Sequence, residues 1–328
     1  MPADQLKASG VQETVTAVLR ALTGTPLVEA AKHVDMEPTE LEVAIDVFRQ
    51  AGTRALEQQA TAPGWWQIYV EFSDWPNSEA TAATHLATLL DRSAAEWWFI
   101  RKHPCWRIRL RLRGRPENMK AAVSTALDAL TAADHIERWW TGVYEPESAA
   151  FGGAEGMAAA HRLFHVDSRA ILTRLHGRRH SPGRRELSVL LCTALMRGAG
   201  LEWYEQGDVW HQVAVERPLP ADATAERLRP MPVQLKKLLL ADLHPDGPLF
   251  AEGSPVSYAT DWVSAFHSTG RALGDAARQG RLQRGVRRTL AYHVIFHWNR
   301  MGLPARTQSF LSWAAYEAVL NTKDTAGR

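Results

Sequence analysis

From Gly64 onward, the chain changes repeatedly between two spacings of its apolar side chains. Four segments rich in aromatic and β-branched residues are typical of strands, and two segments between them have apolar residues three or four positions apart, as helices do. Asn77 or Ser78 is expected to cap the first of these helices, and Pro116 to open the second. The pattern predicts strands over 65–72, 97–102, 106–113 and 136–146, and helices over 74–93 and 115–134.

The order β-α-β-β-α-β predicts an α+β fold with a split, ferredoxin-like antiparallel sheet. In that arrangement the two helices cover one face of the sheet and leave the other face open. The segment WRIRLRLR alternates in polarity, so Arg107, Arg109, Arg111 and Arg113 share one face of their strand. We expect this four-arginine face to be the open one, where the charges meet water or an anionic or polar partner.

Beyond Gly153 the apolar spacing is helical almost throughout, which predicts a mainly helical C-terminal half. Tryptophan doublets are a second unusual feature, because neighbouring residues of a strand point to opposite faces. Such doublets indicate strands that are covered on both sides or that line a groove. The predicted helices lie within 154–176, 184–200, 230–243, 263–280, 283–302 and 307–320, and the doublets are Trp65 with Trp66, Trp97 with Trp98, and Trp139 with Trp140.

Residues 1–62 predict a separate small helical unit, and residues 64–328 a second domain joined to it by a linker at 60–63. Within the unit, a short helix, a turn at 35–38 and a longer helix from Thr39 are similar to a helix-turn-helix. The second helix carries Glu40, Glu42 and Asp46, the wrong charge for a phosphate backbone. A helical cap or a peptide-docking module is therefore the preferred reading, and DNA binding remains the alternative.

Composition adds limits rather than a function. The chain has 38 Lys and Arg against 36 Asp and Glu, which gives no general attraction to nucleic acid or to a membrane. Two cysteines cannot form a disulfide framework, and neither a targeting sequence nor an apolar run of membrane-spanning length is evident. These observations predict a cytoplasmic protein.

The sequence has few signs of cofactor or metal chemistry. Three histidine pairs stand four residues apart, but none belongs to an HExxH pattern and no CxxC accompanies them. There is no phosphate-binding glycine loop and no GxSxG elbow. We therefore expect neither a metal nor a cofactor. The pairs are His161 with His165, His176 with His180, and His293 with His297.

Three stretches in order along the chain resemble signatures of one family, the lantibiotic dehydratase C-terminal or thiopeptide-type bacteriocin biosynthesis family. They are FIRKHPCWRIRLRLRG at 99–114, YEPESAAFGG at 144–153 with AHRLFHVDSRAIL at 160–172, and YHVIFHWNRMGL at 292–303. The resemblance implies an enzyme that acts on ribosomally made precursor peptides. Its members either eliminate glutamate from glutamylated Ser and Thr or, as stand-alone relatives, join two dehydroalanines into the pyridine of thiopeptides.

One departure from the family pattern helps to choose between these reactions. Eliminating members typically show a pattern like E-x-x-R-Y-G-G, whereas this chain has ESAAFGG, so Glu147 matches but Ala150 replaces the arginine and Phe151 the tyrosine. A charge-assisted pair between an arginine and the carboxylate of the leaving glutamate would stabilise the bound peptide by roughly 1.5 to 3 kcal/mol. The alanine at position 150 cannot make this pair. The preferred prediction is therefore a pyridine synthase that needs no cofactor, and a glutamate-elimination subunit with a glutamylating partner is the alternative. A non-catalytic peptide- or DNA-binding protein is the second alternative.

The resemblance also implies roles for single residues. Arg109 and Arg111 match the family's strand arginines, Arg107 stands where the family has a histidine, and His297, Asn299 and Arg300 match its H-x-N-R helix. His297 and Tyr144 are predicted as the acid and base, with Glu147 orienting one of them and Arg109 polarising the amide oxygen. The substrate peptide is expected to carry a leader, and we expect the N-terminal unit to bind that leader. Other enzymes of the same pathway are possible partners. The remaining substrate-binding candidates are Arg107, Arg111, Asp74, Trp75, Trp98, Asn299 and Arg300.

Overall fold

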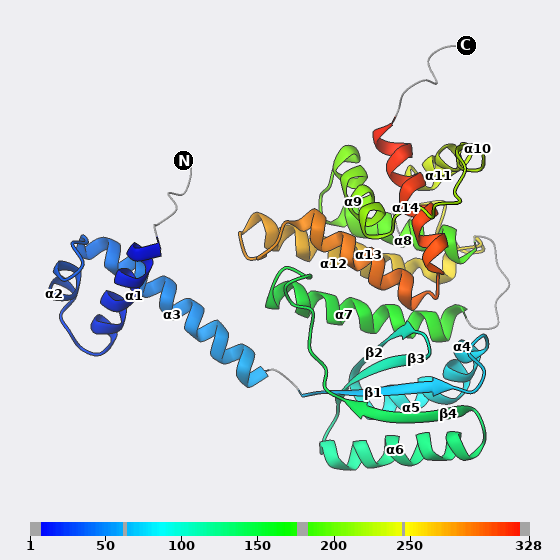
Figure 1. Cartoon of the computed structure of the whole chain (residues 1–328), viewed down its shortest axis with the longest axis horizontal. Coiled ribbons are helices and arrows are strands. Elements are labelled where there is room, and N and C mark those ends of the chain that lie inside the picture. The colour runs from blue at the N-terminus through cyan, green and yellow to red at the C-terminus, as the bar shows by residue number, and fades with distance from the viewer. Residues whose placement is uncertain (1–7, 62–63, 176–182, 245–246, 322–328) are drawn as a thin grey trace, which may run out of the picture. The chain divides into compact units, whose positions relative to one another are not determined.

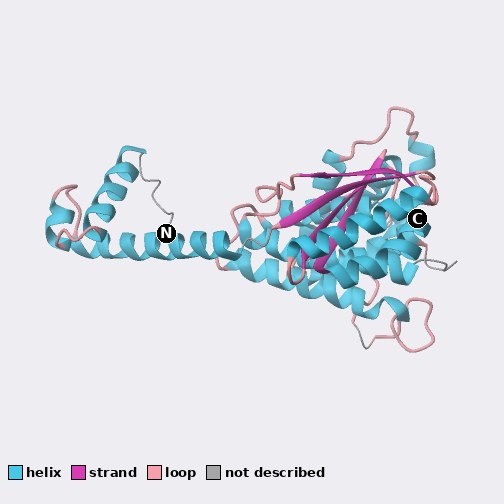
Figure 2. Ribbon diagram, turned by 90° about the horizontal axis from the view of Figure 1, so that it is seen from below, coloured by secondary structure: helices cyan, strands magenta, loops and turns pink. Residues whose placement is uncertain are grey.

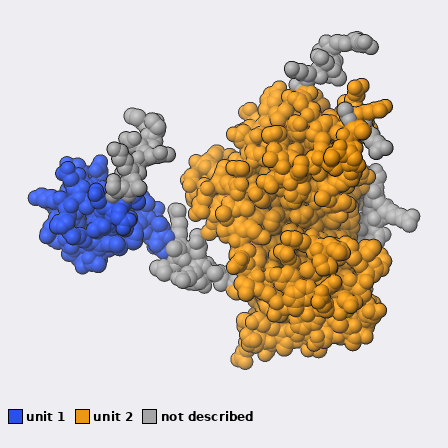
Figure 3. Space-filling view, viewed as in Figure 1, with its two compact units in different colours: residues 1–63 blue, residues 64–328 orange. Residues whose placement is uncertain are grey.

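The computed structural model describes residues 8–61, 64–175, 183–244 and 247–321. The chain divides into two compact units, Met1–Pro63 and Gly64–Arg328, each with its own set of internal contacts (Figure 3). No helix in these described ranges is long and apolar enough to cross a membrane. The histidine pair of His176 and His180 and the residues after Asn321 lie outside the described residues.

The N-terminal unit is a small helical bundle. The side chains of Val18, Ala30 and Leu41 form its core, and Asp35 turns the chain with a positive φ of 51° between the second and third helices. The third helix continues to Thr61, so the part of the expected linker at Ala60 and Thr61 is helical instead. Its acidic side chains, Glu40, Glu42 and Asp46, are exposed. The helices are α1 (Ala8–Leu22), α2 (Leu27–Lys32) and α3 (Pro38–Thr61).

The larger unit begins with a four-stranded antiparallel sheet, drawn in magenta in Figure 2. Its strand order, β2-β3-β1-β4, confirms the ferredoxin-like prediction. Its crossover helices connect β1 to β2 and β3 to β4. The strands are β1 (Trp65–Phe72), β2 (Ala94–Lys102), β3 (Cys105–Leu112) and β4 (Ile136–Gly142). The helices are α4 (Ser78–Thr81), the π-helical turn η1 (Ala82–Leu86), α5 (Ala87–Ser93) and α6 (Pro116–Ala132).

One face of the sheet forms a core with the crossover helices. Ile108 and Leu110 of β3 are buried in the same cluster as Leu90 of α5 and Val123 and Leu127 of α6. The alternation of apolar and charged residues in β3 therefore directs every second side chain into this layer. Burying an aliphatic side chain of this size stabilises the fold by about 1.5 to 3 kcal/mol.

The opposite face is not open along its whole width, which corrects the prediction for the four-arginine face. Helix α7 (Ala154–Ala170) lies across the β2 side of the sheet, opposite α6 (Figure 1). Trp97 and Trp98 are consequently both fully buried, one on each face of β2. Arg109 is only 3% exposed, and Arg113 lies just beyond the end of β3. The sequence up to β4 gives no sign of α7, because the covering element comes from the next segment of the chain.

The remainder of the unit is helical, as predicted, and it includes one long helix that the apolar pattern does not predict. That helix, α9 (Trp203–Glu216), begins with a capping box in which the side chains of Glu202 and Glu205 accept backbone N–H groups. The other elements are η2 (Ile171–Leu175), α8 (Arg184–Gly198), α10 (Ala225–Leu228), α11 (Met231–Leu239), η3 (Ser257–Ala259), α12 (Thr260–Arg278), α13 (Val286–Arg300) and α14 (Ala305–Leu320).

Two features fix the helical half to itself and to the sheet. Helices α8 and α12 approach so closely that a Cβ atom on Gly270 would lie 2.0 Å from the carbonyl oxygen of Leu195. Between the layers, the Glu79 carboxylate of α4 pairs with Arg101 of β2 and with Arg184 of α8. Burial raises the pKa of Glu79, but the two guanidinium groups outweigh it and lower that pKa overall. The carboxylate is therefore ionised and joins three elements.

Candidate active site

Arg109 lies at the centre of the arginine-bearing face. Its Nε donates a 2.7 Å hydrogen bond to Oε1 of Gln67 on β1, and its guanidinium lies 4.2 Å from the ring centre of Trp98 on β2. These two residues flank Arg109 in the sheet register, so the strands themselves set the contact. Among the described residues, Nη1 of Arg109 is buried and has no hydrogen-bond partner. A buried donor in this state is available to a ligand.

The charge on Arg109 persists despite its burial. Burial lowers the pKa of Arg109 to about 10, and the neighbouring Tyr144 and Glu147 oppose that shift. A guanidinium with this pKa is still protonated at neutral pH. The group is thus a cation held in a fixed place by Gln67 and Trp98. Its hydrogen bonds within the protein offset only part of the free-energy cost of burying its charge.

Tyr144 stands beside Arg109, two residues beyond the end of β4. The Arg109 guanidinium lies 5.1 Å from its ring centre, and its hydroxyl oxygen is 2.8 Å from Nε2 of His161 on α7. Burial, and then the positive charges of Arg109, Arg111 and Arg162, lower the pKa of His161 to about 4. Burial and the nearby Glu147 raise the pKa of Tyr144. At neutral pH the two groups are a neutral phenol and a neutral imidazole that share a hydrogen bond.

The segment between Tyr144 and α7 carries Glu147 into the same region. Its carbonyl oxygen accepts hydrogen bonds from the backbone N–H groups of Ala150 and Phe151, which closes a turn. Gly152 and Gly153 follow with φ values of 84° and 93°, a conformation that favours glycine, and α7 begins at once. Phe151 is fully buried against Phe164 and Phe296. The turn therefore holds the backbone while the Glu147 side chain stays exposed.

A cleft of about 420 Å³ opens between this arginine face and the helical half. Among the described residues, Lys102, Arg107 and Arg109 have no carboxylate partner within ion-pair distance, and Nε of Arg107 is buried without a hydrogen bond. The cleft therefore combines excess positive charge with aromatic walls. It is lined by Ile100, Arg101, Lys102, Arg107, Arg109, Glu147, Glu216, Arg217, Tyr292, Ile295, Phe296 and Asn299.

His297 and Arg300 lie elsewhere, in the interior of the helical half. Both are fully buried, and both contact the carboxylate of Asp167: His297 through Nδ1 at 2.9 Å and Arg300 through Nε at 2.6 Å. Burial raises the pKa of Asp167, but the charges and hydrogen bonds of these two partners outweigh it and lower that pKa. Trp262 donates a further hydrogen bond to the same carboxylate. The network joins α7, α12 and α13, and neither residue lines the cleft.

The other predicted site residues divide between the cleft and its surroundings. Asn299 lines the cleft and accepts a hydrogen bond from Gln308. Arg111 pairs with Glu96 at 3.3 Å and is not part of the lining. Asp74 accepts hydrogen bonds from the backbone and side chain of Asn77 at the start of α4, and Trp75 packs on His103. The structure thus brings Arg107, Arg109, Glu147 and Asn299 together in the lining of the cleft, and Tyr144 and Trp98 contact Arg109 from outside that lining.

Several residues of this region were not among the site residues predicted from the sequence. Gln67 occupies a polar position in the alternation of β1, so the same two-residue period that identified the arginines could have singled it out. His161 was noticed only as half of a histidine pair. Tyr292 and Phe296 lie one turn apart on α13 and form the far wall. No sequence signal ties these two aromatic residues to β3, because the contact spans nearly two hundred positions.

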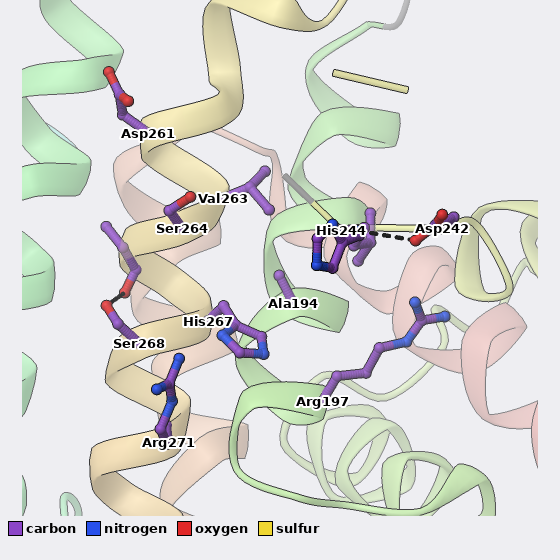
Figure 4. A pocket seen from close by; sticks show the side chains of 12 residues that line it. Ala194, Arg197, Asp242, His244, Asp261, Val263, Ser264, His267, Ser268 and Arg271 are labelled. Atoms are coloured by element: carbon purple, nitrogen blue, oxygen red, sulfur yellow. Dashed lines mark hydrogen bonds between the residues drawn. The ribbon is translucent and has the colours of Figure 1, made fainter. Parts of the chain in front are cut away.

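A larger cavity, of about 810 Å³, lies away from the sheet between α8, α12 and the chain after α11 (Figure 4). Its polar groups are mostly engaged within the protein. Arg197 donates to the carbonyl oxygens of Ala241 and Leu239, and Asp261 pairs with Arg174. His267 and Arg271 lie at its exposed rim. We favour the smaller cleft because its lining includes buried polar atoms without partners, Nε of Arg107 and Nη1 of Arg109.

No group of three potential His, Cys, Asp or Glu ligands lies close enough to hold a metal ion in the part of the chain that the structure describes. The cleft itself presents fixed cations and the Glu147 carboxylate, and the phenol of Tyr144 with its imidazole partner His161 lies beside Arg109. Such a set can bind an oxygen that gains negative charge and can move protons to and from a bound molecule.

The family model for the lantibiotic biosynthesis dehydratase C-terminal region matches residues 65–319. The curated proteins contain no match to the sequence. Similar solved structures include the tRNA-dependent lantibiotic dehydratase MibB from Microbispora sp. 107891, with a TM-score of 0.59 and 19% identity, covering 79% of this chain but 28% of that one.

Two further solved structures are matched over nearly their whole length. TsrL has a TM-score of 0.55 and 17% identity, covering 77% of this chain and 93% of that one. The pyridine synthase TbtD from thiomuracin biosynthesis has a TM-score of 0.55 and 13% identity, covering 79% and 98%. At these identities the likeness is one of fold. The chain spans less than a third of MibB but corresponds to nearly all of the other two proteins.

Proposed function

Because the chain belongs to the lantibiotic biosynthesis dehydratase C-terminal family, we propose that it is a stand-alone pyridine synthase acting on a dehydroalanine-containing precursor peptide. The observation that carries the proposal is the cleft itself. It presents Arg109 and Arg107 with unpartnered donors, while Ala150 stands where eliminating members have an arginine. The cleft can thus bind polar peptide groups, but it lacks the arginine with which eliminating members would bind the carboxylate of the leaving glutamate.

The reaction joins two dehydroalanines in a formal [4+2] cycloaddition. The amide of the first becomes its iminol, so that C(OH)=N–C=CH₂ forms a four-atom diene. Its CH₂ carbon bonds to the CH₂ carbon of the second dehydroalanine, and its C(OH) carbon bonds to the second α-carbon. Loss of water from the former carbonyl carbon, and of the leader as a carboxamide from the second α-carbon, leaves the aromatic pyridine. No oxidant or reductant is required.

The residues of the cleft, together with Tyr144 beside Arg109, suit each proton movement in this sequence. Arg109 Nη1 would donate to the amide oxygen and stabilise the iminol, an effect comparable to the roughly 10²–10³-fold contribution of a single oxyanion donor. Glu147, which is exposed at the cleft, would move the amide proton from nitrogen to oxygen and would later accept one ring proton in each of the two eliminations. Tyr144 would protonate the departing oxygen or nitrogen, with His161 as its hydrogen-bond partner.

Holding the two olefins together is the larger requirement. Orientation of two reactants in a fixed geometry contributes on the order of 7 to 11 kcal/mol to such reactions. The walls formed by Tyr292 and Phe296 on α13, opposite the arginines of β3, give a confined space for flat unsaturated groups. His297, Arg300 and Asp167 would act at a distance by fixing α13 against α7, because all three are buried behind that wall.

The test compares two substrates by mass spectrometry. One is a synthetic precursor with its leader and two dehydroalanines, and the other is the same peptide with glutamylated serines. A cyclising enzyme releases water and the leader carboxamide from the first and leaves the second unchanged. Loss of glutamate from the second, with the first unchanged, would refute the proposal and make elimination the function.

A further inference from the structure

The two edges of the sheet differ. At the β2 edge, α7 supplies partners to the outward backbone groups: the N–H of Phe99 donates to the hydroxyl of Ser168 at 3.2 Å, and the carbonyl oxygen of Trp97 lies 3.0 Å from Nδ1 of His165. At the β4 edge, no backbone group of Ile136–Gly142 has a hydrogen-bond partner outside the sheet among the described residues. One edge is thus closed by a helix, while the other keeps a row of free donors and acceptors.

A continuous row of stacked side chains connects the candidate cleft to this free edge. Arg107 lines the cleft and lies 5.6 Å from the ring centre of Tyr69 on β1. Tyr69 stacks on Trp140 of β4, with ring centres 5.1 Å apart and planes 3° from parallel. The guanidinium of Arg138 lies 5.2 Å from the Trp140 ring. Trp140 is 38% exposed, although it is one of the largest apolar side chains in the molecule.

The strand also leads directly into the site. Beyond Gly142, Val143 is 83% exposed while its carbonyl oxygen accepts a hydrogen bond from Gln67, the residue that holds Arg109. Tyr144 is the next residue, and Glu147 follows three positions later. Two residues of extended chain span about 7 Å. A peptide paired along β4 would therefore end about that distance from the acid and base groups.

We propose that the β4 edge binds an extended segment of the precursor peptide as a fifth strand, in register to deliver the residues that follow it into the cleft. The inference rests on the proposed function for the identity of the peptide. Backbone hydrogen bonds would supply the affinity, and alternate peptide side chains would contact Trp140 on the cleft face and Trp139 on the α6 face. Binding through the backbone suits an enzyme whose substrate side chains have been altered.

Amide hydrogen exchange of the full-length chain tests the inference without turnover. The probe is the precursor peptide with serine at both dehydroalanine positions, which can bind but cannot cyclise. We expect alternate amides of Ile136–Gly142 to exchange at least about tenfold more slowly when the peptide is saturating, while the amides of β2 remain unchanged. A peptide that binds without slowing β4, or that does not bind, would overturn the inference.

Backbone N-methylation of the probe supplies the second measurement. In a strand pair, every second peptide N–H points toward the neighbouring strand, so methylating successive residues should weaken binding at alternate positions only. An effect without this period of two would contradict strand addition. Protection of β4 in the peptide-free chain, together with a dimer in solution, would instead assign the edge to a second copy. Because the probe cannot react, absence of cyclisation by the same protein would count against the proposed function and not against this inference.

Discussion

At the residue scale, one alternating strand places its arginines in different environments. Arg109 is buried with a free donor, Arg107 is half-buried at the cleft, and Arg111 is paired with Glu96 near the surface. The alternation in the sequence predicts that they share a face. It cannot predict which of them is buried, since α7 and the residues 144–153 decide that from outside the strand.

Replacing Arg109 with lysine should slow the reaction without unfolding the protein. Lysine keeps the charge but cannot donate to Gln67 and to a substrate oxygen with the same fixed fork. Loss of about 1.5 to 3 kcal/mol of charge-assisted bonding corresponds to roughly a 10- to 150-fold decrease in kcat/KM. The control is Arg113→Lys, whose side chain reaches the carbonyl oxygen of Ala94 outside the cleft. Equal activity of the two variants would contradict the role of Arg109.

The buried histidines make the fold sensitive to acid. Burial lowers the pKa of His293 from 6.5 to about 4. Between these two pH values the unfolded chain binds a proton that the folded chain does not, so stability is complete above pH 6.5 and falls as the pH decreases toward 4. From pH 7 to pH 5, His293 alone should lower the free energy of unfolding by about 2 kcal/mol.

Urea denaturation at pH 7 and pH 5 measures this effect. We expect His293→Leu to lose less stability than the wild type over the same interval, by about 2 kcal/mol. His161, whose pKa is also lowered to about 4, acts in the same direction in both proteins. Identical pH slopes for wild type and variant would show that His293 does not titrate as proposed.

At the scale of elements, the sequence predicts most of the sheet unit and less of what surrounds it. All four strands and both crossover helices were predicted, because each pattern is local to its element. The covering of the arginine face and helix α9 were not. Charged and polar residues interrupt the apolar pattern of α9. Its start is marked by a capping box, which can be identified in the sequence only when Glu202 and Glu205 are considered together.

The close crossing of α8 and α12 gives a sharp test of packing. A methyl group at Gly270 would lie 2.0 Å from the carbonyl oxygen of Leu195, and backbone cannot retreat without moving a helix. We expect Gly270→Ala to lower the free energy of unfolding by roughly 3 kcal/mol or more. Gly52→Ala, in open space on α3, should instead be neutral or slightly stabilising. A wild-type melting temperature for Gly270→Ala would show that the two helices are further apart than described.

At the scale of the whole molecule, the two units have separate cores. The N-terminal core is built from α1, α2 and α3, and the family match lies wholly within the second unit. We propose that the first unit binds the leader of the precursor. The acidic residues exposed on α3 make it a poor partner for DNA and suit a peptide with basic or apolar contacts.

Removal of residues 1–63 tests this division. The remaining chain should keep its melting temperature, because no residue of its core cluster comes from the first unit. We expect KM for a leader-bearing precursor to rise, with a smaller change in kcat. Unchanged KM and kcat in the truncated protein would remove the leader-binding role from this unit.

If the arginine cleft forms a pyridine from two dehydroalanines, the amide nitrogen of the first dehydroalanine becomes the ring nitrogen. The most direct measurement uses a precursor with ¹⁵N in the amide of the first dehydroalanine and follows the product by NMR and mass spectrometry. We expect the wild type to give a ¹⁵N resonance of an aromatic pyridine nitrogen and to release water and the leader carboxamide. We expect no such product from a folded variant with Arg109→Met and Tyr144→Phe. A labelled peptide recovered unchanged from the wild type, or the same ring formed at the wild-type rate by the variant, would contradict this role of the cleft.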